Sequence, residues 1–191
     1  VYDKEKRYLI RDLAYPGEEV VLVEGGKGGR GNEGGRQAQS GESGRSLELL
    51  LSLKILADVF IVGLPNSGKS KLLNRVSHAR VKEEVYPFST KHPELGVYET
   101  SDFEQIRICE LPGLYRESPG GRGAGVNFLK HLERAKMIFL MLDPLNDFAD
   151  SLEDGYRLLT GILTGFSPAI SEIPRTVVVN KMDLPEARER F

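Results

Sequence analysis

Residues 63–70 read Gly-Leu-Pro-Asn-Ser-Gly-Lys-Ser, a spacing that can wrap main-chain N–H groups around phosphate oxygens. A helix beginning at such a loop adds a favourable dipole for an anion. Lys69 could place a cation against the β- and γ-phosphates, and Ser70 could offer a hydroxyl to Mg²⁺. The alternative is a glycine turn that matches by chance. The segment predicts a nucleotide-binding P-loop made of Gly63, Pro65, Asn66, Ser67, Gly68, Lys69, Ser70 and Lys71.

A second polar motif, Asn180-Lys181-Met182-Asp183, directly follows the β-branched run 176–179. The Asp183 carboxylate can accept two hydrogen bonds from guanine N1 and N2, a donor pair that adenine lacks. Asn180 could meet the base or brace the P-loop, and the aliphatic stem of Lys181 could cover the base face. An ordinary polar turn is the alternative. The motif nevertheless follows an expected strand, and ligands of open α/β sheets bind at the C-terminal ends of strands.

Two further segments could respond to a γ-phosphate. Glu110, at the end of an expected strand, could hold Mg²⁺ through water, and the Gly113 N–H could sense the phosphate. Thr90 could supply a hydroxyl to Mg²⁺ and an N–H to the γ-phosphate. The glycine-rich loop 113–125 is attached to the acid motif, so we interpret it as a switch. The alternatives are an ordinary strand exit, a loop hydroxyl and a surface loop without a switching role.

The pattern after Leu56 predicts the scaffold for these residues. Apolar runs alternate with helical periodicity, which is typical of a mainly parallel sheet flanked by helices. Helices are expected over 69–77 and 152–163, around 128–132, and from Pro185 onward. Strands are expected over 59–62, 95–99, 103–109, 137–142 and 176–179, with 95–99 and 103–109 as a connected pair.

The first part of the chain is glycine-rich: nine of the 21 glycines lie between Gly25 and Gly44. Such a stretch is either a flexible linker or a set of closely packed, polyproline-type extended chains. The composition by itself favours the linker. The alternation over 19–23, after a turn at Pro16-Gly17, predicts a strand leading into it.

Composition excludes several classes of protein. A net charge of −2 over 191 residues argues against a strongly basic nucleic-acid binder. The single cysteine, Cys109, lies in an apolar run and is interpreted as a buried, unreactive thiol. His78, His92 and His131 have no metal-ligand spacing and are interpreted as structural or solvated. No apolar stretch is long enough to span a membrane, so a reducing, cytoplasmic location is the default, with an organelle as the alternative.

Together these motifs resemble the Obg family of GTPases. The resemblance covers nearly the whole chain and rests on Leu56-Ala57-Asp58-Val59, the P-loop, Tyr86-Pro87-Phe88-Ser89-Thr90, Leu95-Gly96-Val97, Pro112-Gly113-Leu114, Gly121-Arg122-Gly123-Ala124-Gly125, Phe128 to Arg134 and the glycine run Gly25 to Asn32. It implies a G domain of the P-loop NTPase class over 57–191, ending after the guanine-specificity motif. Residues 1–56 would form the C-terminal part of the family's glycine-rich domain. Since that domain consists of packed polyproline-type helices in the family, the resemblance favours packing over a linker.

The resemblance also implies function. Family members bind GTP and GDP, hydrolyse GTP slowly and associate with the large ribosomal subunit and its rRNA during assembly; a monomer is expected. It assigns catalysis to Lys69, Thr90 and Gly113, Mg²⁺ to Ser70, Thr90 and Glu110, and guanine to Asn180, Lys181 and Asp183. Glu110 stands where the family has aspartate. Asn66 stands where related GTPases place an asparagine that helps bind K⁺.

Leu114 occupies the position where many small GTPases carry a water-orienting glutamine, so slow unassisted turnover is expected. The alternative function is a non-hydrolysing guanine-nucleotide-binding or RNA-docking module, with hydrolysis lost through Glu110 and Leu114. A P-loop ATPase is disfavoured by Asn180 and Asp183.

Overall fold

A computed structural model of the chain describes residues 1–5, 8–32, 37–81, 92–115 and 126–191. The chain divides into two compact units, Val1–Leu53 and Lys54–Phe191. The proposed switch residues Tyr86 to Thr90 and the greater part of the loop 113–125 lie outside the described residues.

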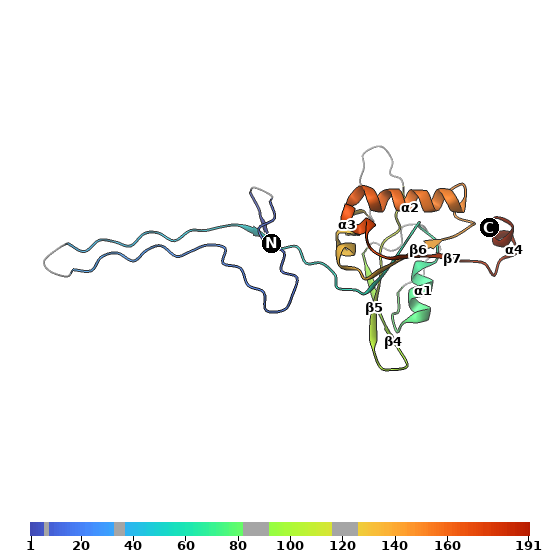
Figure 1. Cartoon of the computed structure of the whole chain (residues 1–191), viewed down its shortest axis with the longest axis horizontal. Helices are drawn as coiled ribbons and strands as arrows, with labels where there is room; N and C mark the ends of the chain where they lie inside the picture. The colour runs from blue at the N-terminus through green and yellow to red at the C-terminus, as the bar shows by residue number, and fades with distance from the viewer. Residues whose placement is uncertain (6–7, 33–36, 82–91, 116–125) are drawn as a thin grey trace. The chain divides into compact units, whose positions relative to one another are not determined.

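The second unit is built on one five-stranded sheet (Figure 1). Its strands are β3 (Val59–Gly63), β4 (Glu94–Glu99), β5 (Gln105–Glu110), β6 (Met137–Leu142) and β7 (Arg175–Val179), in the order β4-β5-β3-β6-β7. All neighbours pair in parallel except β4 and β5, which form an antiparallel hairpin. This confirms the predicted, mainly parallel sheet and the predicted pair at 95–109.

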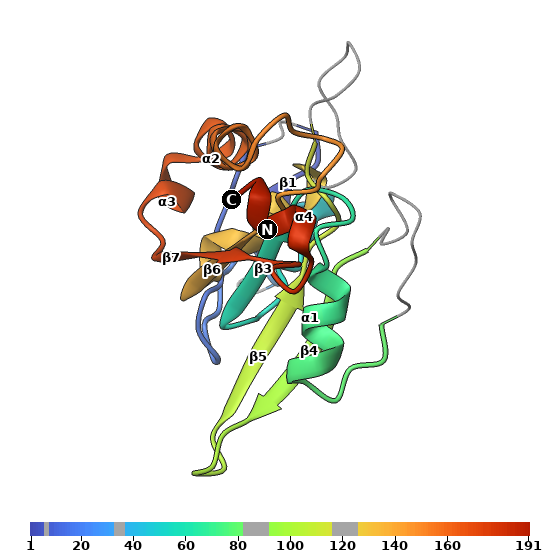
Figure 2. The ribbon, with the colours of Figure 1, turned by 90° about the vertical axis from the view of Figure 1, so that its right-hand side faces the viewer.

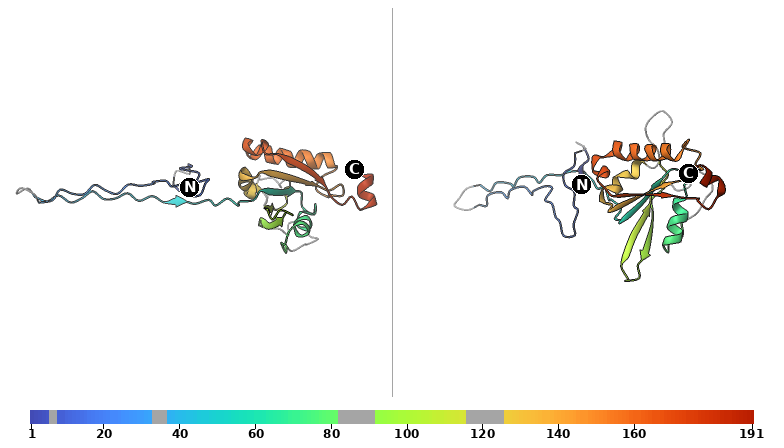
Figure 3. Two further views of the ribbon diagram at one scale, coloured as in Figure 1. Left: turned by 60° about the horizontal axis from the view of Figure 1, so that its bottom comes forward. Right: turned by 45° about the vertical axis from the view of Figure 1, so that its right-hand side comes forward.

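Helices cover both faces of this sheet (Figure 2 and Figure 3). Helix α1 (Lys69–Val76) lies on one face, and α2 (Leu152–Phe166) with the short α3 (Pro168–Ser171) lies on the other. Helix α2 begins at Ser151, whose hydroxyl accepts a hydrogen bond from the Asp154 N–H at 3.1 Å. The remaining elements are η1, a 3₁₀-helix over Val126–Arg134, and α4 (Pro185–Glu189).

Two apolar clusters fill the space between sheet and helices. Phe60 and Val62 of β3 point into the cluster that contains Leu159 and Leu163 of α2. Ile61, the residue between them, packs instead with Leu73 of α1. Because successive side chains of a strand point to opposite faces, a strand covered on both sides is apolar at every position. This explains the continuous apolar runs of β3 and β6.

The first unit pairs β1 (Tyr2–Asp3) with β2 (Leu49–Leu50) and carries two extended, glycine-rich runs. The Gln39 N–H donates to Arg30 O at 3.0 Å and the Glu42 N–H donates to Lys27 O at 2.8 Å. A Cβ atom at Gly26 or Gly29 would collide with the facing backbone, so these glycines permit the close approach.

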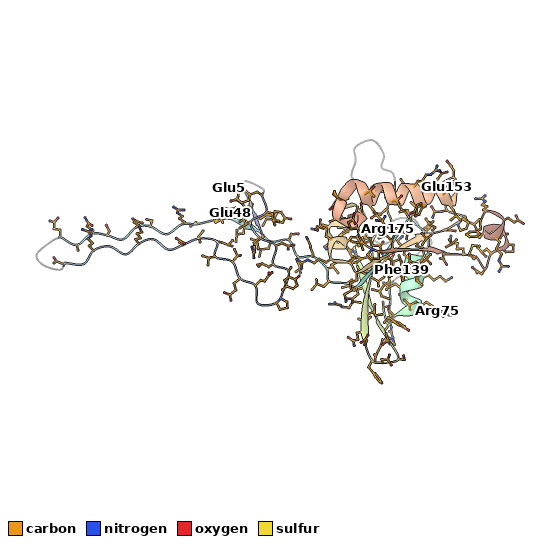
Figure 4. The ribbon with its side chains drawn as sticks, viewed as in Figure 1. Glu5, Glu48, Arg75, Phe139, Glu153 and Arg175 are labelled. Atoms are coloured by element: carbon orange, nitrogen blue, oxygen red, sulfur yellow. The ribbon has the colours of Figure 1, made fainter. Side chains whose placement is uncertain are left out.

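These contacts fit packed extended chains and not a flexible linker. The strand predicted over 19–23 was wrong, because these residues join no sheet in the structure. Between the two runs the hydrogen bonds on Lys27 and Arg30 are three residues apart, which is not the spacing of a β-ladder. Glu48, labelled in Figure 4, forms an ion pair with Lys4 at 2.6 Å. Among the described residues, no helix combines the length and apolar character needed to cross a membrane.

Candidate functional site

The predicted P-loop connects β3 to α1, the strand–loop–helix context that its sequence requires. Two of its residues adopt left-handed backbone conformations, Asn66 with φ 58° and Gly68 with φ 94°. Gly68 also lies so close to the Asn180 side-chain amide that a Cβ atom would collide with it. Glycine is therefore needed at this position for both conformation and space.

The carbonyl of Leu64 holds the loop and its lysine in place. It accepts hydrogen bonds from Ser67 Oγ at 2.9 Å and from Lys69 Nζ at 2.8 Å. Burial lowers the pKa of Lys69 to about 8, against the opposing attraction of the Glu110 carboxylate. Phosphate oxygens would offer this buried ammonium a stronger partner than one carbonyl.

Ser70 and Glu110 come together from α1 and the end of β5. Ser70 Oγ donates to Glu110 Oε1 at 2.8 Å, and Glu110 is buried. A hydroxyl and a carboxylate are hard oxygen donors of the kind Mg²⁺ prefers, so these residues fit the ion. Thr90, the third expected ligand, lies outside the described residues.

Gly113 and Leu114 follow this acid and lie against the P-loop. The Leu114 N–H donates to Gly63 O at 3.0 Å, and a Cβ atom at Gly113 would lie 2.9 Å from Pro65 N. The Gly113 backbone is therefore next to the phosphate loop. The Leu114 side chain, in contrast, is 1% exposed and packs in the core, where it cannot contact a water molecule at the site.

The guanine motif follows β7 and reaches the P-loop through Asn180. The Asn180 side-chain N–H donates to Ser67 O at 2.9 Å. Of the two roles considered for Asn180, contact with the base or bracing of the P-loop, this bond corresponds to the second. Asp183 is exposed after the end of β7, where its carboxylate is open to a ligand. An open hollow along α1 is lined by Gly68 of the P-loop, by Asn180, and by the α1 residues Lys71, Leu72, Asn74 and Arg75. Lys71 thus faces the same space as the two motifs.

Sequence reasoning missed two residues in the loop after β6. Asp143 forms an ion pair with Lys181 at 2.6 Å. The Asn146 side-chain N–H donates to Pro65 O at 2.7 Å. Asp143 directly follows an expected strand, so the argument that selected Asn180 and Asp183 also applied to it.

The residues interpreted as structural behave as expected. Burial raises the pKa of the Cys109 thiol to about 12, so it is unreactive at neutral pH. His131 is buried and its Nδ1 accepts a hydrogen bond from the Ile55 N–H at 3.0 Å, while burial also lowers its pKa. His78 and His92 are exposed. Within the described ranges there is no cluster of three or more His, Cys, Asp or Glu side chains that could hold a metal ion.

Comparisons with known proteins agree with this geometry. Residues 58–181 match the family model described as 50S ribosome-binding GTPase. The chain is 39% identical to the GTPase Obg of Syntrophomonas wolfei over 99% of its own length and 47% of that protein's. It is also 39% identical to the GTPase Obg of Desulfosudis oleivorans, over 98% of its length and 59% of that protein's. The chain therefore spans about half the length of the curated relatives it matches.

Solved structures share the fold of the second unit. A crystal structure of Era in complex with MgGDPNP and a segment of 16S ribosomal RNA has a TM-score of 0.54 and 29% identity, over 70% of this chain and 43% of that one. NFeoB from S. thermophilus, bound to GDP, AlF4⁻ and K⁺, has a TM-score of 0.52 and 25% identity, over 71% of this chain and 48% of that one.

Proposed function

Because this chain belongs to the family of 50S ribosome-binding GTPases, and within it to the Obg GTPases, we propose that it binds GTP and GDP with Mg²⁺ and hydrolyses GTP slowly. The observation that carries the proposal is the meeting of three segments at the C-terminal ends of parallel strands. The P-loop follows β3, Glu110 ends β5, and Asn180 after β7 donates to Ser67 of the P-loop.

In this proposal Lys69 exchanges the Leu64 carbonyl for the β- and γ-phosphate oxygens when nucleotide enters. Ser70 and Glu110, which are hydrogen-bonded to each other, would hold Mg²⁺, with Thr90 as the third expected ligand. The bound ion supplies positive charge against the charge that develops on the phosphates. The Gly113 N–H, next to Pro65, donates to the γ-phosphate. The buried Leu114 side chain cannot orient the attacking water. GTP hydrolysis therefore depends on the positions and charges of the other groups, and it is slow.

Guanine selection falls to Asp183, whose exposed carboxylate accepts from the N1–H and N2–H groups of the base. ATP offers no such donor pair, and binding it would desolvate the carboxylate without a partner. Asn66 at the P-loop is a candidate K⁺ contact. Support for K⁺ comes from the similar structure of NFeoB with GDP, AlF4⁻ and K⁺.

We further propose that the nucleotide state controls association with the large ribosomal subunit during its assembly. The support is the description of the matching family, 50S ribosome-binding GTPase. The complex of Era with 16S ribosomal RNA supports an association with ribosomal RNA in general and not the choice of subunit. A monomeric, cytoplasmic protein is proposed with it. The second candidate, a non-hydrolysing guanine-nucleotide module, is favoured by Glu110 in place of aspartate and by the buried Leu114.

Co-sedimentation with purified large subunits tests the ribosomal proposal. The chain is incubated with large subunits and a non-hydrolysable GTP analogue, GDP or no nucleotide, each with Mg²⁺. We expect more protein in the ribosomal pellet with the analogue than with GDP, and Lys69→Ala should remove the difference. Equal amounts in all three conditions would contradict a nucleotide-controlled association.

A further inference from the structure

The loop between β6 and α2 contacts both halves of the nucleotide site, although it was not part of either motif. It begins with Asp143, whose side chain is fully buried and lies 2.6 Å from the Lys181 ammonium. The Lys181 side chain is 34% exposed. The partner of Lys181 is therefore a fixed, desolvated carboxylate inside the protein and not a mobile surface acid.

The loop itself fixes the orientation of this carboxylate. Asp143 Oδ1 accepts a hydrogen bond from the Leu145 N–H at 3.0 Å, while Oδ2 is the oxygen that faces Lys181. The Asn146 N–H closes the turn on Asp143 O at 3.2 Å. With one oxygen held by its own turn, Asp143 presents the other in a single direction.

Lys181 is also constrained by its backbone. Its φ is 61°, a left-handed conformation that is uncommon for a residue with a side chain, and its carbonyl accepts from the Leu184 N–H at 2.9 Å. Such conformations persist where the surroundings determine them, and they cluster at ligand sites. The ion pair with Asp143 fixes the far end of the same side chain.

Asn146, three residues after Asp143, holds the P-loop by a side-chain hydrogen bond. Its side-chain N–H donates to Pro65 O at 2.7 Å, and its Oδ1 accepts from the Phe148 N–H at 3.0 Å. Asn146 is 7% exposed, so its buried side-chain amide has a hydrogen-bond partner at both the nitrogen and the oxygen. The Pro65 backbone is the part of the P-loop against which Gly113 packs.

We propose that Asp143 and Asn146 are positioning residues of the nucleotide site: Asp143 holds Lys181 across the base position, and Asn146 holds the phosphate loop at Pro65. This inference rests on the proposed binding of guanine nucleotides. Groups fixed before the ligand arrives lose less entropy on binding, so the contribution appears mainly as slower nucleotide release.

The test compares the release rate of fluorescent GDP from the whole chain and from matched variants. Asp143→Asn keeps the size of the side chain and removes its charge, and we expect release to become about tenfold faster, the equivalent of one decade in affinity. Asp147→Asn, at an exposed acid of the same loop, is the control and should release GDP at the wild-type rate.

A double-mutant comparison separates positioning from general stability. Lys181→Gln should also speed GDP release, and adding Asp143→Asn to it should cause no further change, because Asp143 acts through Lys181. An undiminished effect of Asp143→Asn in the Lys181→Gln background would overturn its assignment. Thermal unfolding of each variant verifies that it folds.

Inorganic pyrophosphate with Mg²⁺, used as a competitor of fluorescent GDP, separates the two residues. Asn146→Ala should weaken pyrophosphate and GDP alike, since it acts through the phosphate loop. Asp143→Asn should weaken GDP and leave pyrophosphate unchanged. Equal losses of both ligands in Asp143→Asn would overturn its role at the base. If the wild-type chain bound no guanine nucleotide, the proposed function itself would fail; wild-type binding with unaffected variants would contradict only the positioning roles.

Discussion

Ser70 Oγ donates a 2.8 Å hydrogen bond to Glu110 Oε1, which joins the first turn of α1 to the end of β5. Aspartate, which the resemblance to the family implies at this position, is one methylene shorter than the glutamate present here. In this chain the two expected Mg²⁺ contacts are already in position relative to each other.

Replacing Glu110 tests this arrangement. Glu110→Gln keeps the reach and removes the charge, so the Mg²⁺ concentration that half-maximally slows GDP release should rise about tenfold, since a carboxylate holds the ion more strongly than an amide does. Glu110→Asp restores the family residue and serves as the comparison. An unchanged Mg²⁺ dependence in Glu110→Gln would show that Glu110 does not contribute to the ion site. A large gain of GTP hydrolysis in Glu110→Asp would indicate that glutamate impairs this site.

The Lys69 ammonium predicts a pH dependence of nucleotide affinity. Its pKa is lowered to about 8 by burial, and bound phosphates would raise it again. Binding therefore takes up a proton above about pH 8, and the affinity for GDP should be nearly constant below that value and fall as the pH rises above it. Titrations of GDP between about pH 6.5 and 9 measure this dependence.

Lys69→Arg is the control for that titration, since a guanidinium stays charged throughout this range. Its affinity for GDP should depend less on pH than that of the wild type. The remaining pH dependence should be the part that arises from the nucleotide's own titrating groups. Identical pH profiles for the two proteins would contradict the role given to Lys69.

Leu114 predicts the rate of GTP hydrolysis. Because its side chain is in the core, we expect the unassisted rate of GTP hydrolysis to lie well below about 1 s⁻¹. Assisted enzymes reach that rate or exceed it. Leu114→Gln should not accelerate hydrolysis. It should instead lower the free energy of unfolding by about 1–3 kcal/mol, because it buries an amide without partners. Phosphate release and urea unfolding measure the two effects, and a wild-type rate above about 1 s⁻¹ would contradict slow unassisted turnover.

Asp58, at the start of the P-loop strand, predicts an acid-sensitive contribution to stability. Its carboxylate accepts hydrogen bonds from the Arg107 side-chain Nε at 3.1 Å and from the Arg107 backbone N–H at 2.9 Å. It also forms an ion pair with the Lys136 ammonium at 2.9 Å. Hydrogen bonding from Arg107 holds the pKa of Asp58 well below its ordinary value of 3.8. Since the folded state favours the carboxylate, this contribution is present above about pH 4 and is lost as the pH falls below it.

Asp58→Asn should therefore lower the free energy of unfolding by about 1–2 kcal/mol at pH 7, a range reduced because both cations are partly in solvent. The difference from the wild type should shrink below about pH 4. Urea unfolding of both proteins at pH 7 and at a pH below about 4 measures this difference in the free energy of unfolding. A difference of the same size at both would show that the charge of Asp58 is not responsible.

The scaffold and much of the site could be predicted from sequence because their signals are local. The run 137–142 predicted β6 with its observed bounds, and the P-loop spacing predicted a strand before it and a helix after it. The region around 128–132 was predicted as helical, but it is a 3₁₀-helix, and such geometry depends on tertiary packing more than on residue spacing.

The contacts missed from sequence join residues far apart in the chain. Asp143 and Lys181 meet because β6 and β7 are parallel neighbours in register, with Leu142 opposite Val179. Asn146 and Pro65 meet because β3 and β6 are also neighbours. Motif spacing carries no information on which strands are adjacent. The residues 19–23 were predicted wrongly because their alternation resembles a strand, although they join no sheet in the structure.

The claim that the chain binds guanine nucleotides at the P-loop and the Asn180–Asp183 motif is tested by titrating the chain with fluorescent GDP and Mg²⁺. Unlabelled GDP, GTP and ATP are then added as competitors. The predicted result is that GDP and GTP displace the probe and ATP does not, because only guanine pairs with the Asp183 carboxylate. Displacement by ATP as effective as that by GTP, or no binding of the probe, would contradict the claim.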